Sequence, residues 1–229
     1  MKTLAAKGRT SALRHTIAAV TKLADRSCAD ETHAMQLALG YAAQAGHVQC
    51  VQVLLDHGTD PAHGDWGPLR YACRQGWLAV VACLLQHPSR PSADTAAGAA
   101  MLHAGMSEAT THGKVPVLRA MLQHSMVDWK PGWLDQLLLL AVSSSREAAL
   151  RLLVLHARAL DMHIHSSLWA SMLESSASQG VTVSLLHAAM DPGQPGGRWC
   201  PTLAEYCAAT QAACRTGIVH AVAAIVCIP

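Results

Sequence analysis

The feature that most constrains this chain is a marker that recurs about every thirty residues. A small residue, Gly or Ser, is followed eleven positions later by His, and the pairs are Gly46–His57, Gly76–His87, Gly113–His124 and Ser145–His156. Three apolar residues stand between the members of each pair, five, eight and nine positions after the small residue. This spacing places them on one stripe of an α-helix. Self-similarity at a period of about 20–50 residues indicates a solenoid of stacked short units.

The apolar stripes predict the core of that solenoid. Each stripe contributes three side chains that we expect to be buried between neighbouring units. Their members are Val51, Leu54, Leu55; Val81, Leu84, Leu85; Leu118, Met121, Leu122; and Leu150, Leu153, Val154.

The two best-preserved units also carry small residues and turn formers. Ala42-Ala43 and Ala72-Cys73 are small enough for two helices to approach closely, and Gly46 and Gly76 can adopt the left-handed conformation that ends a helix. Pro68 suits a first helical turn, where no backbone donor is needed. These residues resemble the ankyrin repeat. In that family Thr-Pro-Leu-His occupies the place of Gly67-Pro68-Leu69-Arg70 here.

The resemblance implies an all-α fold, an ankyrin-type helix-turn-helix repeat solenoid of about six to seven repeats. It is clearest over 37–87 and covers nearly the whole of residues 1–229, which we expect to form one domain. The approximate units are 1–30, 31–62, 63–93, 94–128, 129–160, 161–194 and 195–229. Another type of helix-pair solenoid, without protruding hairpin loops, is the alternative.

Three places depart from the repeat pattern. In the first unit, Ile17, Val20 and Leu23 suggest a degenerate repeat whose turn position is held by His15. Glu108 replaces an apolar residue in the fourth unit, and the segment 161–194 fits least well.

The charge distribution argues against a nucleic-acid-binding stripe. Residues 1–24 carry five basic and no acidic residues, whereas residues 25–229 carry 12 basic and 15 acidic residues, so that +5 and −3 give the net charge of +2. We interpret the basic start as a solvated first repeat, with organelle targeting as the alternative. An intracellular, cytoplasmic protein is expected. No membrane span is expected, because the most apolar uncharged run, 216–229, is shorter than the ~20 residues that a bilayer requires.

The histidines and cysteines raise a metal or redox hypothesis. The sharpest local candidate is the pair His163 and His165 with Asp161, but no third and fourth ligand follow at a recognised spacing. The eight cysteines form no CxxC pair, and Cys50, Cys73 and Cys214 fall on core positions. We therefore expect no cofactor and no metal site.

Catalytic motifs do not stand out either. No Ser or Cys lies in a Gly-flanked elbow, and Gly193-Gln194-Pro195-Gly196-Gly197 lacks the Lys-Ser/Thr that completes a phosphate loop. The acidic residues are dispersed, so no carboxylate pair can be assigned. The sequence predicts that the protein is not an enzyme and has no catalytic residues.

By resemblance, the predicted function is that of a non-catalytic protein–protein interaction module that acts as an adaptor, a scaffold or a blocking inhibitor. The alternatives are a metal- or redox-responsive His/Cys-rich binding protein and an enzyme with an unrecognised site. The expected partner is another protein, not nucleic acid. Self-association through the apolar C-terminal helix is a further expectation. Polar and aromatic residues in the connecting segments predict a partner-binding strip, formed by His63, Asp65, Trp66, Arg90, Trp129, Lys130 and Trp133. Alternatively, Trp66 folds back over Tyr71 or Trp77.

Overall fold

The computed structural model describes residues 1–22, 28–87, 95–124 and 132–160, and the regular structure in these ranges is entirely α-helical. The chain divides into two compact units. The first contains Met1–Ala109 and Pro116–Asp128, and the second contains Thr110–Val115 and Trp129–Pro229.

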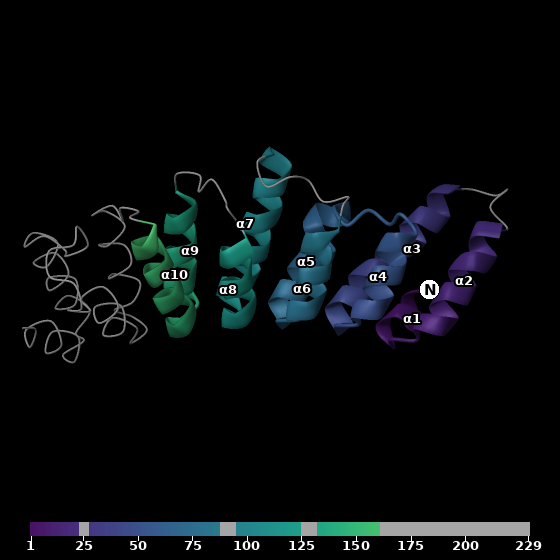
Figure 1. Ribbon diagram of the computed structural model, residues 1–229, viewed down its shortest axis with the longest axis horizontal. Coiled ribbons are helices and arrows are strands. Elements are labelled where there is room, and N and C mark those ends of the chain that lie inside the picture. The colour runs from purple at the N-terminus through teal and green to yellow at the C-terminus, as the bar shows by residue number, and fades with distance from the viewer. Residues whose placement is uncertain (23–27, 88–94, 125–131, 161–229) are drawn as a thin grey trace, which may run out of the picture. The chain divides into compact units, whose positions relative to one another are not determined.

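The described helices follow one another as antiparallel pairs joined by tight turns (Figure 1). The expected helix-turn-helix repeats are thereby confirmed within the described ranges. In chain order the helices are α1 (Lys2–Ala6), α2 (Thr10–Lys22), α3 (Cys28–Ala45), α4 (Val48–Asp56), α5 (His63–Gln75), α6 (Leu78–Gln86), α7 (Ala96–Thr111), α8 (Val115–His124), α9 (Trp133–Ser143) and α10 (Glu147–Ala159).

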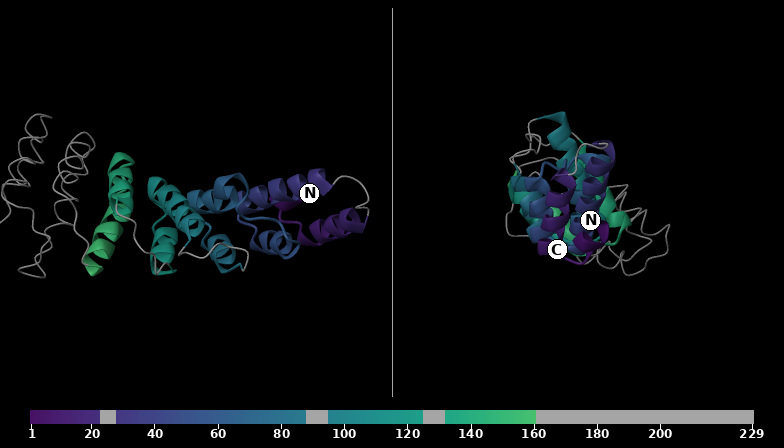
Figure 2. Two further views of the ribbon diagram at one scale, coloured as in Figure 1. Left: turned by 90° about the horizontal axis from the view of Figure 1, so that it is seen from above. Right: turned by 90° about the vertical axis from the view of Figure 1, so that its right-hand side faces the viewer.

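The helices of the first unit form two layers. The first helices of successive repeats, α1, α3 and α5, contact one another in one layer, and the second helices, α2, α4 and α6, contact one another in the other (Figure 2). All twelve residues of the predicted apolar stripes are buried, with at most 4% of any of them exposed. The small pairs Ala42-Ala43 and Ala72-Cys73 are completely buried. The core therefore lies between the two layers, where the 5/8/9 spacing predicts it.

The turn of the first repeat lies at Gly8 rather than at His15, so the predicted register of this repeat is wrong. Gly8 has a φ of 66°, and His15 lies inside α2. The residues five and nine positions after Gly8, Leu13 and Ile17, are fully buried. The residue eight positions after it is Thr16, which breaks the apolar stripe and conceals the true spacing from a search for hydrophobic residues.

Three of the described turn glycines are each covered by a side chain of the following repeat, an arrangement that we call the turn clamp. The covering residue is always the one directly after the next repeat's turn position, and its side chain donates a hydrogen bond of 3.0 Å to the carbonyl two residues before the covered glycine. The pairs are Gly8 with His47, Gly46 with Trp77, and Gly113 with Arg146. The accepting carbonyls belong to Ala6, Gln44 and Thr111, respectively.

The second unit contains the pair α9 and α10, whose facing side chains Leu137, Leu138, Leu150 and Leu153 are fully buried. Ser145 occupies the turn position of this repeat with a φ of 56°, a conformation that glycine adopts more easily. The small residue of the fourth marker pair, Ser145, thus lies in the turn between α9 and α10.

The number of repeats stays a prediction. The units expected at 161–194 and 195–229 lie outside the described residues, as do the apolar C-terminal helix and the histidine pair His163 and His165. The proposed single domain and its unit boundaries likewise remain predictions. The boundary placed after residue 30 falls inside α3.

Candidate partner-binding surface

The outward side of the first helices in the first unit is the best candidate for a binding surface. On α5, Leu69, Ala72 and Cys73 are buried in the core, so residues 67, 70, 71 and 74 follow the opposite side of the same helix. The equivalent positions of α3 and α7 extend this side across the layer. We call it the first-helix face and define it by Leu37, Tyr41, Arg70, Tyr71, Arg74 and Glu108.

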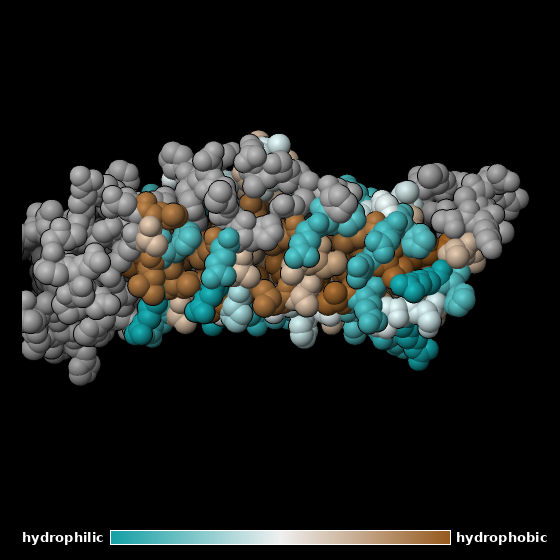
Figure 3. Space-filling view, in the orientation of Figure 1, coloured by the Kyte–Doolittle hydropathy of each residue, from teal (hydrophilic) through white to brown (hydrophobic). Residues whose placement is uncertain are grey.

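Aromatic and aliphatic side chains occupy one part of the first-helix face. Leu37 is 43% exposed and Tyr71 is 44% exposed. The Tyr71 ring lies close to α3, because a Cβ added to Gly40 would stand 3.9 Å from its Cε2 atom. Tyr41 occupies the same position one repeat earlier, and Lys2 Nζ lies 4.3 Å from the centroid of its ring. Figure 3 shows one face of the first unit, on which hydrophobic residues lie between hydrophilic ones.

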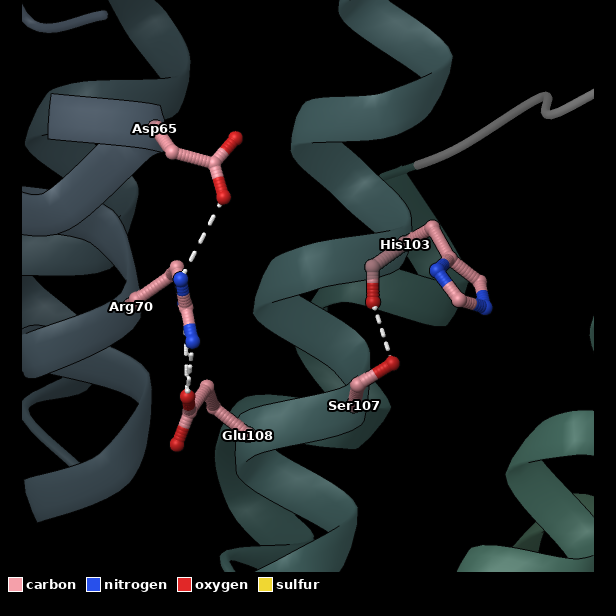
Figure 4. Close-up of polar contacts among 5 residues, drawn as sticks. All are labelled: Asp65, Arg70, His103, Ser107 and Glu108. Atoms are coloured by element: carbon pink, nitrogen blue, oxygen red, sulfur yellow. Dashed lines mark hydrogen bonds and ion pairs between the residues drawn. The ribbon is translucent and has the colours of Figure 1, made fainter. Parts of the chain in front are cut away.

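An ion-pair cluster centred on Arg70 joins α5 to α7 (Figure 4). The Arg70 Nη2 atom lies 2.9 Å from Glu108 Oε1 and its Nε atom lies 3.3 Å from the same oxygen, while Nη1 lies 3.3 Å from Asp65 Oδ2. Glu108 is only 21% exposed, whereas Asp65 is 81% exposed. The contact with Glu108 therefore fixes the guanidinium group, and the contact with Asp65 adds little because it is solvated.

This cluster explains the irregular residue at position 108. An acidic side chain stands where an apolar residue was expected because its partner, Arg70, stands on the neighbouring repeat. Directly before Glu108 in α7, the Ser107 hydroxyl donates a hydrogen bond of 2.8 Å to the His103 carbonyl within the same helix (Figure 4). This bond holds the Ser107 side chain against its own helix.

A shallow hollow of about 260 Å³ opens beside the cluster, lined by Gly64, Gly67, Arg70, Tyr71, Arg74 and Glu108. The glycines leave the space that side chains would otherwise fill. Arg74 is exposed, and within the described part of the chain it makes no hydrogen bond or ion pair. The hollow thus combines an unpaired cation with an exposed aromatic ring.

The predicted partner-binding strip is only partly described. Asp65 and Trp66 lie at the start of α5, where residues 64–66 adopt left-handed backbone angles before the regular helix begins at Gly67. His63 begins α5, and Trp133 begins α9 in the second unit, where it is half-buried. The structure brings Asp65 to Arg70. Arg90, Trp129 and Lys130 lie outside the described residues, so the strip as a whole stays a prediction.

Trp66 is half-buried. Of the two residues over which it was expected to fold back, Trp77 lies beyond the opposite end of α5, where its ring covers Gly46. Trp77 is thus the covering residue of the turn clamp at Gly46.

Cys50, Cys73 and Cys83 are free thiols, and Cys50 and Cys73 are fully buried as predicted. Burial raises the pKa of the Cys73 thiol to about 12, and the nearby Glu108 carboxylate adds to the effect. Its Sγ atom lies 3.7 Å from Met121 Sδ in the core. Cys73 is therefore a protonated core residue at neutral pH. Within the described ranges no three His, Cys, Asp or Glu side chains gather as a metal site would require.

None of the described helices combines the length and the apolar character needed to cross a membrane.

These features define a protein of the helix-pair repeat class, whose first helices in the first unit offer an exposed surface. Residues 4–97 match the family described as "Ankyrin repeats (3 copies)". The ankyrin repeat domain of human ASB11, known from a crystal structure, has the same fold, with a TM-score of 0.62 and 21% sequence identity over 98% of this chain and 95% of that chain. No curated protein matches the chain in sequence. Residues 4–97 thus carry ankyrin repeats, and the chain has the fold of an ankyrin repeat domain, as its sequence predicted.

The residues of the first-helix face were not part of the predicted strip. Tyr41, Arg70 and Tyr71 stood in the sequence as members of the repeat pattern, and Glu108 as an exception to it. One signal was present: Arg70 and Glu108 are opposite charges at unusual positions of neighbouring units. Leu37 and Arg74 gave no signal that distinguished them from other helical residues.

Proposed function

We propose that this protein is a non-catalytic adaptor, scaffold or blocking inhibitor that binds another protein through the first-helix face. Ankyrin repeats generally mediate protein–protein interaction. The observation that carries the proposal is the joint exposure of Leu37 and Tyr71 on neighbouring helices beside the Arg70 cluster. Tyr and Arg are enriched among the residues that dominate binding energy in protein interfaces, and an exposed apolar neighbour such as Leu37 adds surface that binding can bury.

The rigidity of the face supports this proposal. The Arg70 guanidinium is held by Glu108, and the Tyr71 ring lies against α3, so little side-chain freedom is lost on binding.

The test is affinity purification of partners followed by direct measurement of binding with each isolated partner. We expect Leu37→Ala and Tyr71→Ala each to weaken binding about tenfold or more, as hot-spot residues do. Leu78→Ala is the matched control, because Leu78 has the same 43% exposure but lies at the start of α6 in the other layer. Equal effects of Leu37→Ala and Leu78→Ala would place the binding site elsewhere.

The predicted strip is the second candidate surface. It is favoured by the exposed Asp65 and by Trp66, which stand next to each other at the start of α5. If partner binding tolerates Leu37→Ala but is lost in the double variant with Trp66→Ala and Trp129→Ala, the strip is the binding site. Both variants must keep the far-ultraviolet circular dichroism of the parent.

A further inference from the structure

We propose that the hollow between α5 and α7 recognises an acidic side chain, Asp or Glu, in a segment of the partner protein that also places an apolar side chain on Tyr71. This inference rests on the proposed function and adds the chemistry of the partner.

The charges around the hollow favour an acid over a base. Both described carboxylates beside it, Asp65 and Glu108, are already engaged with Arg70. Arg74, one helical turn further on, projects from the same side of α5 and keeps all its donors available among the described residues. An incoming carboxylate therefore meets an unpaired guanidinium, whereas an incoming ammonium group would have to compete with Arg70.

The shape of the hollow favours a side chain rather than a flat contact. Gly64 and Gly67 form part of its lining and present only backbone, and Tyr71 forms an apolar wall. The Tyr71 hydroxyl has no hydrogen-bond partner within the described residues, so it can donate a second hydrogen bond to the same carboxylate. Charge-assisted hydrogen bonds from a guanidinium to a carboxylate are stronger than neutral ones.

The experiment uses the full chain and a phage-displayed library of short random peptides. We expect selected peptides to share an Asp or Glu next to an apolar residue. One selected peptide is then synthesised together with its amide version, in which the acid becomes Asn or Gln. Arg74→Gln should weaken binding of the acidic peptide about fivefold or more and change binding of the amide version less than about twofold.

Arg119→Gln is the matched control, because Arg119 is an equally unpaired and exposed arginine of the first unit that lies on the second helix α8. It should leave both affinities unchanged. A true contact with Arg74 should also weaken as salt is raised.

Two results would overturn this inference alone: peptides that need Leu37 and Tyr71 but tolerate Arg74→Gln, or basic peptides whose binding depends on Asp65. In both cases the proposed function would stand. If instead neither Leu37→Ala nor Tyr71→Ala weakens any selected peptide, the first-helix face itself is contradicted.

Discussion

Thr110 shows how a single residue can depart from its repeat. The second residue of the small pair, three positions before the turn, is fully buried in every described repeat. In the other repeats this residue is Ala5, Ala43, Cys73 or Val142. Thr110 instead brings a hydroxyl into this slot, and its Oγ1 atom is buried without a hydrogen-bond partner. A buried hydroxyl in this state costs about 1–3 kcal/mol of folding free energy.

We therefore expect Thr110→Val to stabilise the protein by about 1 kcal/mol, because valine keeps the shape of threonine and removes the unpaired hydroxyl. Urea unfolding followed by circular dichroism measures the change. Thr110→Ser serves as the control: it keeps the hydroxyl and loses the methyl group, so it should destabilise. A loss of stability in the valine variant would mean that the hydroxyl is satisfied in solution.

At the scale of elements, the turn clamps at Gly8 and Gly46 couple successive helix pairs of the first unit. Trp77 covers Gly46 so closely that a Cβ at this position would lie 2.7 Å from the indole carbons Cδ2 and Cε2. Gly58 has nearly the same backbone, with a φ of 80° against 81°, but a Cβ added there would meet no atom within 4 Å. Comparing alanine substitutions at the two glycines therefore separates the cost of backbone strain from the cost of displacing a side chain of the next repeat.

Gly46→Ala should therefore destabilise the protein by at least about 1 kcal/mol more than Gly58→Ala, since both suffer the strain of a left-handed alanine but only the first displaces the Trp77 ring. Thermal unfolding of the two variants checks the difference. In a Trp77→Ala background the costs of the two substitutions should become equal, as a double-mutant cycle would report. A difference that persists without the indole ring would exclude the clamp as its cause.

At the scale of the whole molecule, the buried thiol of Cys73 links stability to alkaline pH. Its pKa of about 12 in the folded chain exceeds the ordinary value of 9.0, mainly because of burial. The folded state therefore retains the thiol proton over a range in which the unfolded chain has lost it. This contribution is fully present below the ordinary pKa and is lost as the pH rises from about 9 towards 12.

We expect the stability of the parent chain to fall relative to Cys73→Ala by up to about 1.4 kcal/mol per pH unit above pH 9. Denaturant unfolding of both proteins between pH 7 and about pH 10.5 measures the difference, and all other titrating groups cancel in the comparison. Parallel curves would show that the thiolate is accommodated in the folded chain.

The sequence alone determined the repeat, its helix pairs and the buried stripes, because hydrophobic spacing and turn glycines are local features that survive in a single chain. It failed at the first turn, where Thr16 interrupts the apolar pattern, and it left the binding residues unresolved. The turn clamp and the Arg70 cluster were decided only by the tertiary structure. Both join residues from neighbouring repeats. In the first unit, the paired residues of the two clamps and of the Arg70–Glu108 ion pair are 33 to 41 positions apart in the sequence. Such contacts depend on how one helix pair stacks on the next, and no spacing within a single repeat encodes that geometry.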